Sequence, residues 1–158
     1  MLKRHIKIDR ESMELISLFN NISGAIIKDC LIFKAPENET EIIIFLVKEE
    51  DVGKAIGKAG EHVKDLKIKL QKKIDIIAFS DNLNQFIHNI LQTTKNSIVI
   101  QDIEVKESRN QKKTVIITVR PQDRGKAIGK DGSMIRKIKG LVLRYFDVDN
   151  VIINTKNI

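Results

Sequence analysis

The sequence lacks the cysteines and the clustered histidines that many small proteins depend on. It contains a single cysteine, Cys30, in 158 residues, so no disulfide can form within the chain. We expect Cys30 to be a small buried residue of a strand rather than a reactive thiol. The three histidines, His5, His62 and His88, do not have the spacing of a zinc site. The sequence therefore predicts neither a metal nor another cofactor.

Aromatic residues and long apolar runs are also scarce. There are six phenylalanines, one tyrosine and no tryptophan. Phe19, Phe45 and Phe86 fall at apolar positions of predicted helices or strands, so few aromatic side chains remain for a base-stacking platform of the RRM or OB-fold type. No apolar run approaches the roughly 20 residues of a membrane span, and no signal peptide is visible. We therefore expect a cytoplasmic protein with no membrane partner.

Catalytic motifs are absent as well. A P-loop needs G-x-x-x-x-G-K followed by serine or threonine. Gly53 and Gly57 are one residue too close for this motif, and Ala59, or Asp131 in a second copy, follows the lysine. Neither G-x-G-x-x-G, G-x-S-x-G nor H-E-x-x-H occurs. The sequence predicts a protein that is not an enzyme and has no small-molecule substrate.

Positive charge is in excess, and it is unevenly distributed. The chain has 28 basic and 21 acidic residues, a net charge of +7. Residues 1–80 hold 14 basic and 13 acidic residues (+1), and residues 81–158 hold 14 and 8 (+6). Such an excess fits a solvated surface or a polyanionic partner, and composition alone does not separate the two.

The main feature of the sequence is an internal repeat with an offset of 72 residues. The stretch DVGKAIGKAGEHVKDLK at 51–67 aligns without a gap with DRGKAIGKDGSMIRKIK at 123–139. The apolar run at 42–47 aligns with the run at 114–119 in the same register. The repeat indicates a tandem duplication.

Each repeat predicts the order helix, strand, strand, helix, helix, strand. Its first helix has apolar residues at helical spacing, with Asp9 or Asp81 as the N-cap. The fold class is α+β, with helices packed on one face of a three-stranded sheet, in domain 1–80 and again in domain 81–158. Strands are predicted at 25–33, 42–47, 74–79, 97–105, 114–119 and 148–154, with turns at 35–39 and 109–113. No flexible linker separates the two domains.

The repeated loop resembles the GxxG loop of KH domains. Its core is Ile-Gly-Lys-x-Gly at 56–60 and 128–132, followed three residues later by Val63 or Ile135. Glycine allows positive φ and lets a sugar-phosphate backbone come close, and the next helix presents free N–H groups to phosphate. The element order matches type II KH domains, and the resemblance implies RNA binding.

Two such domains in direct tandem resemble the KH pair of the NusA family. The stretches LFNNISGAIIKDC, LVKEEDVGKAIGKAG and RYFDVDNVII are similar to the short, archaeal-type members, and the resemblance covers the whole chain. It implies a single-stranded-RNA-binding factor of transcription elongation or termination, with RNA polymerase as a second partner. We expect neither the N-terminal polymerase-binding domain nor the OB-fold domain of longer members.

The predicted RNA-binding residues lie on the two loops and on the helices beside them. Loop lysines would meet phosphates, and basic residues of the next helix would follow the RNA backbone. The loop isoleucines would either hold a base in an aliphatic groove or belong to the core. Each of these helix residues alone fits a solvated helix face equally well. The full set is Lys54, Ile56, Gly57, Lys58, Ala59, Gly60, Lys64, Lys67, Lys126, Ile128, Gly129, Lys130, Asp131, Gly132, Arg136 and Lys139. Asp131 departs from the pattern, because it places an acid in the second loop.

Two other functions fit the same residues. Type II KH domains also occur in factors of ribosome assembly or translation, and sequencing of bound RNA would separate these from a transcription factor. A protein-interaction scaffold whose KH folds do not bind RNA is the other alternative. It would fail to shift a labelled single-stranded RNA.

Overall fold

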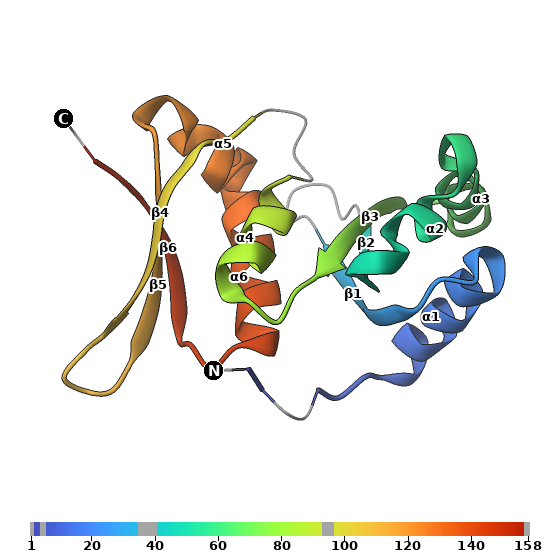
Figure 1. Ribbon diagram of the computed structural model, residues 1–158, viewed down its shortest axis with the longest axis horizontal. Coiled ribbons are helices and arrows are strands. Elements are labelled where there is room, and N and C mark those ends of the chain that lie inside the picture. The colour runs from blue at the N-terminus through green and yellow to red at the C-terminus, as the bar shows by residue number, and fades with distance from the viewer. Residues whose placement is uncertain (1, 4–5, 35–40, 93–96, 157–158) are drawn as a thin grey trace. The chain divides into compact units, whose positions relative to one another are not determined.

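The computed structural model describes residues 2–3, 6–34, 41–92 and 97–156 (Figure 1). Its contacts group the chain into two compact units. The first unit is Lys7–Ser80, and the second unit combines Met1–Ile6 with Asp81–Ile158. Each unit holds a three-stranded mixed sheet and its own helices, which confirms the predicted α+β fold. The division into domains 1–80 and 81–158 stays a prediction.

The first unit has the predicted order of elements. They are α1 (Arg10–Ser23), β1 (Ile27–Lys34), β2 (Glu41–Lys48), α2 (Val52–Ile56), α3 (Glu61–Leu70) and β3 (Lys73–Phe79). β2 is the central strand, antiparallel to β1 and parallel to β3. The turn predicted at 35–39 lies outside the described residues.

The core of the first unit lies between the sheet and its three helices. Phe19 of α1 packs edge-on against Phe45 of β2, with 4.8 Å between the ring centroids, and both side chains are fully buried. Ala55 of α2 and Leu66 of α3 belong to the same cluster. Cys30 of β1 also belongs to it, and burial raises the pKa of its thiol to about 12. The predicted burial of Cys30 in a strand is confirmed.

The second unit repeats this order. Its elements are α4 (Leu83–Leu91), β4 (Ile100–Glu107), β5 (Lys113–Val119), α5 (Arg124–Ile128), α6 (Ser133–Tyr145) and β6 (Asn150–Thr155). β5 is the central strand, and the helices lie to the right of the sheet in Figure 1. Phe86 of α4 is buried against Tyr145 and Phe146. The Lys3 N–H donates to the Tyr145 carbonyl at 2.7 Å, which attaches the N-terminal segment to the end of α6.

The helix starts follow the sequence prediction in one unit and depart from it in the other. The Asp9 side chain accepts from the Ser12 N–H at 2.8 Å, so Asp9 caps α1 as predicted. The prediction of Asp81 as the second N-cap is wrong. α4 begins at Leu83, and Asn82 caps it by accepting from the Gln85 N–H at 3.0 Å. Asp81 therefore lies one residue outside the cap position.

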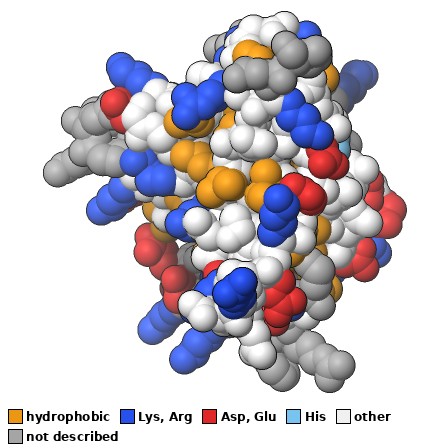
Figure 2. All heavy atoms as spheres, turned by 90° about the vertical axis from the view of Figure 1, so that its left-hand side faces the viewer, with side chains coloured by type: hydrophobic (Ala, Val, Ile, Leu, Met, Phe, Trp, Pro, Cys, Tyr) orange, Lys and Arg blue, Asp and Glu red, His pale blue; other side chains and the backbone are white. Residues whose placement is uncertain are grey.

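The face of the second sheet that points away from its helices is partly apolar. Ile116 of β5 and Ile152 of β6 are neighbours in the parallel register, and Ile152 is 40% exposed. Figure 2 looks onto the side of Figure 1 on which these strands lie, and it shows hydrophobic side chains with both basic and acidic ones around them. Among the described residues, none of the helices is both long and apolar enough to cross a membrane.

Candidate nucleic-acid interface

The two GxxG loops have the same backbone conformation. In the first, Gly57, Ala59 and Gly60 have φ of 80°, 55° and 73°. In the second, Gly129, Asp131 and Gly132 have φ of 79°, 54° and 75°. Three of the four residues in each loop thus lie at positive φ, and the loop forms a tight turn between two helices.

Glycine is required at the first loop position for two reasons. Gly57 and Gly129 have ψ of 170° and 168°, which places them in a region of backbone space used almost only by glycine. A Cβ on Gly57 would also lie 2.7 Å from the His62 Nδ1, and one on Gly129 would lie 2.7 Å from the Met134 backbone nitrogen. Any side chain here would change the loop.

Gly53 and Gly125 occupy a different environment, although the sequence places them in the same motif. Neither has positive φ, and a Cβ on either would meet no atom within 4 Å. Both are exposed and lie in the short helices α2 and α5, where glycine is less favourable than alanine. Folding does not explain these two glycines, but an approaching ligand backbone would.

The Asp131 position favours an aspartate on conformational grounds. Its φ and ψ of 54° and 30° are left-handed, and aspartate tolerates this region better than alanine does. Ala59 adopts nearly the same angles, 55° and 26°. Asp131 therefore fits its loop, and its carboxylate is exposed at the tip.

The structure places most of the predicted site residues on the surface around the loops. Lys54, Lys58, Lys126 and Lys130 are exposed on the short helices and loops. The basic side chains of the following helices are exposed too: Lys64, Lys67, Arg136 and Lys139. Ile56 is 37% exposed and Ile128 is partly buried, whereas the preceding alanines, Ala55 and Ala127, are fully buried. Ile56 is thus not a core residue.

Sequence reasoning missed a carboxylate that supports each loop. The Asp51 Oδ2 accepts from the Ile26 N–H at 2.7 Å, and the Asp123 Oδ2 accepts from the Val99 N–H at 3.0 Å. Each bond ties the segment before a strand to the segment before a glycine loop. The aspartate occupies the same place in both repeats, so the alignment contained this signal.

Asp123 also organises cations beside the second loop. It is fully buried, and the Arg120 Nε donates to its Oδ2 at 2.7 Å. This hydrogen bond raises the pKa of Arg120, and together with the one from Val99 it holds the pKa of Asp123 below its ordinary value. Within the described part of the chain, Asp123 Oδ1 accepts no hydrogen bond, and the Lys126 Nζ lies 4.0 Å away. The predicted contact residue Lys126 is therefore held near a carboxylate.

Two further side chains fix the loops to the next helix. The His62 Nδ1 lies 2.8 Å from the Lys54 carbonyl, to which a protonated Nδ1 donates. In the second unit, the Arg136 Nη1 donates to the Asp131 carbonyl at 3.0 Å.

The described residues contain no group of histidine, cysteine, aspartate and glutamate side chains that could hold a metal ion.

Comparison with known proteins agrees with this geometry. The family model described as KH domain matches residues 15–107 and 82–158. A "Probable transcription termination protein NusA" from Methanococcus vannielii is 38% identical over 146 residues, which cover 92% of this chain and 78% of that protein. The protein of the same name from Thermoplasma acidophilum is 30% identical over 151 residues, covering 96% and 97%. This chain belongs to the archaeal NusA-like proteins with two KH domains.

A solved structure supports the same assignment. The crystal structure of APE1850 superposes on this chain with a TM-score of 0.77 and 31% sequence identity, covering 93% of this chain and 100% of that one. The NusA-like family therefore accounts for the fold over nearly the full length. Membership in it also implies a protein that is not an enzyme.

Proposed function

We propose that this NusA-like chain binds single-stranded RNA through its two GxxG loops and acts in transcription elongation or termination. The observation that supports this most directly is the shared loop backbone, in which three positive-φ residues recur within a few degrees. The residue that is not glycine, Ala59 or Asp131, is strained at positive φ; such strain persists only where the surrounding structure enforces it, and it often marks a ligand site. RNA polymerase is the second partner in this proposal.

The loops and the helix starts that follow them would contact the RNA backbone. α3 and α6 begin after Gly60 and Gly132, and neither N-cap makes a side-chain hydrogen bond to the first turn. The Glu61 and Ser133 N–H groups donate to the Lys58 and Lys130 carbonyls. The next N–H groups of each first turn would remain available to a phosphate, which the positive end of the helix dipole also favours. The exposed Lys64 and Lys67, or Arg136 and Lys139, would continue this positive surface along the helix.

Charge reversal at both loops tests the proposal. We expect Lys58→Asp with Ala59→Asp, combined with Lys130→Asp, to weaken binding of a labelled single-stranded RNA by more than about tenfold. The fold should survive, because Asp131 shows that this backbone accepts aspartate. Titration would measure affinity, and circular dichroism would report the fold.

The control is Lys73→Asp with Lys112→Asp, which changes the charge by −4 where the loop variant changes it by −5. Lys73 pairs with Ile42 at the start of β2, and exposed Lys112 precedes β5, so both lie at the strand ends away from α2 and α5. Equal losses in the two variants would refute loop-centred binding.

A second experiment decides between transcription and translation. RNA crosslinked to the protein in cells would be sequenced: nascent transcripts would support a role in transcription, and ribosomal RNA would support the alternative in ribosome assembly or translation.

A further inference from the structure

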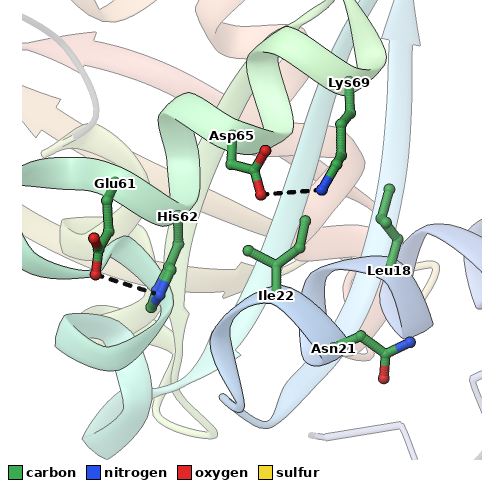
Figure 3. A pocket seen from close by; sticks show the side chains of 7 residues that line it. All are labelled: Leu18, Asn21, Ile22, Glu61, His62, Asp65 and Lys69. Atoms are coloured by element: carbon green, nitrogen blue, oxygen red, sulfur yellow. Dashed lines mark hydrogen bonds and ion pairs between the residues drawn. The ribbon is translucent and has the colours of Figure 1, made fainter.

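The first unit contains a groove that the RNA-binding proposal does not use. It lies between α1 and α3 and has a volume of about 660 Å³. Leu18 and Ile22 of α1 are partly buried and form its apolar floor. Figure 3 shows Ile22 pointing toward α3, below the ion pair of Asp65 and Lys69. The groove therefore combines apolar surface with charged walls.

The charge of this groove is unfavourable for RNA. The exposed Glu61 and the partly buried Asp65 line it from α3. Lys69 is the cation in its lining, and its Nζ lies 3.1 Å from the Asp65 Oδ2. Helical spacing places Glu11 and Glu14 on the same face of α1 as Leu18, toward the start of the helix. Lys64 and Lys67 do not line the groove.

The second repeat has replaced the residues that make this groove. The counterparts of Glu61, Asp65 and Lys69 at the 72-residue offset are Ser133, Lys137 and Leu141. Leu141 is fully buried, so an apolar core residue stands where Lys69 forms a polar wall. An acid has likewise become a base at Lys137. The acidic, apolar groove is thus a property of one repeat, whereas the GxxG loop is common to both.

We propose that the groove between α1 and α3 docks a basic segment of a partner protein, with apolar side chains placed against Leu18 and Ile22. Charge complementarity selects this occupant, since lysine or arginine would meet Glu61 and Asp65 while aliphatic groups cover the floor. An amphipathic helix with cations flanking its apolar stripe has this chemistry. RNA binding need not hold for this proposal.

The groove also has a physical connection to the first glycine loop. His62 lines it, and the same ring lies against Gly57 and bonds to the Lys54 carbonyl. A segment that contacts His62 would therefore touch a residue that supports the loop. In the second unit Met134 occupies this position.

The test uses the full chain and a synthetic amphipathic peptide of about 16 leucine and lysine residues, with leucine on one helical face. Two-dimensional NMR of the labelled protein would map the bound surface. We expect the peptide to shift the amides of Leu18, Ile22 and Asp65. The same peptide with glutamate for lysine, and a lysine peptide without leucine, should not bind there.

Variants make the result specific. Glu61→Lys with Asp65→Lys should weaken peptide binding roughly tenfold, because two attractive contacts become repulsive. Glu49→Lys with Glu50→Lys reverses two exposed acids outside the groove and should change affinity by less than about twofold. Equal losses, peptide shifts elsewhere, no binding at about millimolar peptide, or groove shifts produced by single-stranded RNA would each overturn the proposal.

Discussion

At the scale of single residues, the glycines of the repeated motif separate into two kinds. The sequence shows six glycines in two matching stretches and suggests one common role. Gly57, Gly60, Gly129 and Gly132 have positive φ, and at Gly57 and Gly129 space is also short, while Gly53 and Gly125 meet neither constraint. Substitution can therefore distinguish a glycine kept for folding from one kept for a ligand.

Alanine at Gly57 and alanine at Gly53 should have opposite effects on stability. We expect Gly57→Ala to destabilise the first unit by about 1–3 kcal/mol through backbone strain alone. The new Cβ would also lie 2.7 Å from the His62 ring, which adds to this loss. Gly53→Ala should stabilise α2 by about 0.5–1 kcal/mol. Urea unfolding would measure both changes.

The same alanine at Gly53 should weaken RNA binding, because its methyl group would occupy the surface that a sugar-phosphate backbone approaches. Titration with single-stranded RNA would measure this loss. A Gly53→Ala variant that unfolds as easily as Gly57→Ala would contradict the assignment of Gly53 to a ligand.

At the scale of elements, the sequence predicts the order well and the boundaries less well. Periodicity and the repeat identify the helices and strands, because burial on one face produces a regular pattern. The strand predicted at 97–105 instead spans Ile100–Glu107. Val99 leaves the sheet because its N–H bonds to Asp123, a contact between residues 24 positions apart. Local patterns carry no information about such a bond. The choice of Asn82 over Asp81 has a different cause, because the cap bond to Gln85 is local but aspartate and asparagine are almost equally good N-caps.

The basic faces of α3 and α6 should contribute unequally to RNA affinity. We expect Arg136→Ala with Lys139→Ala to lower affinity and to reduce the salt slope by roughly 0.7 for each lost phosphate contact. Lys64→Ala with Lys67→Ala should do less, because the first half carries a net charge of +1 and the second +6. Affinities over a salt series would decide. A larger loss in the α3 variant would show that charge balance is a poor guide to where RNA lies.

At the scale of the whole molecule, the junction between the repeats is short. β3 ends at Phe79 and α4 begins at Leu83, so residues 80–82 connect them and span at most about 11 Å. The sequence predicts this directly, since no glycine- or serine-rich segment occurs there. A second loop on so short a connection would meet the same RNA strand at high effective concentration.

RNA length should therefore have a steep effect on affinity. A KH loop holds about four nucleotides, so two loops require a strand of roughly eight or more. We expect a flexible glycine–serine insert between Ser80 and Asp81 to lower affinity for long RNA while leaving that for four nucleotides unchanged. The measurement is a titration of RNAs of increasing length. Equal affinity for four and twelve nucleotides would show that the sites act separately or that one alone binds.

The left-handed residue at the loop tip has an evolutionary consequence. Ala59 and Asp131 share one backbone conformation, and neither side chain is buried. Codons for alanine and aspartate can differ by a single base, so one mutation can add or remove a negative charge at this tip without disturbing the core. After a duplication, the two copies could thus diverge in their attraction for phosphate while selection on folding left both loops intact.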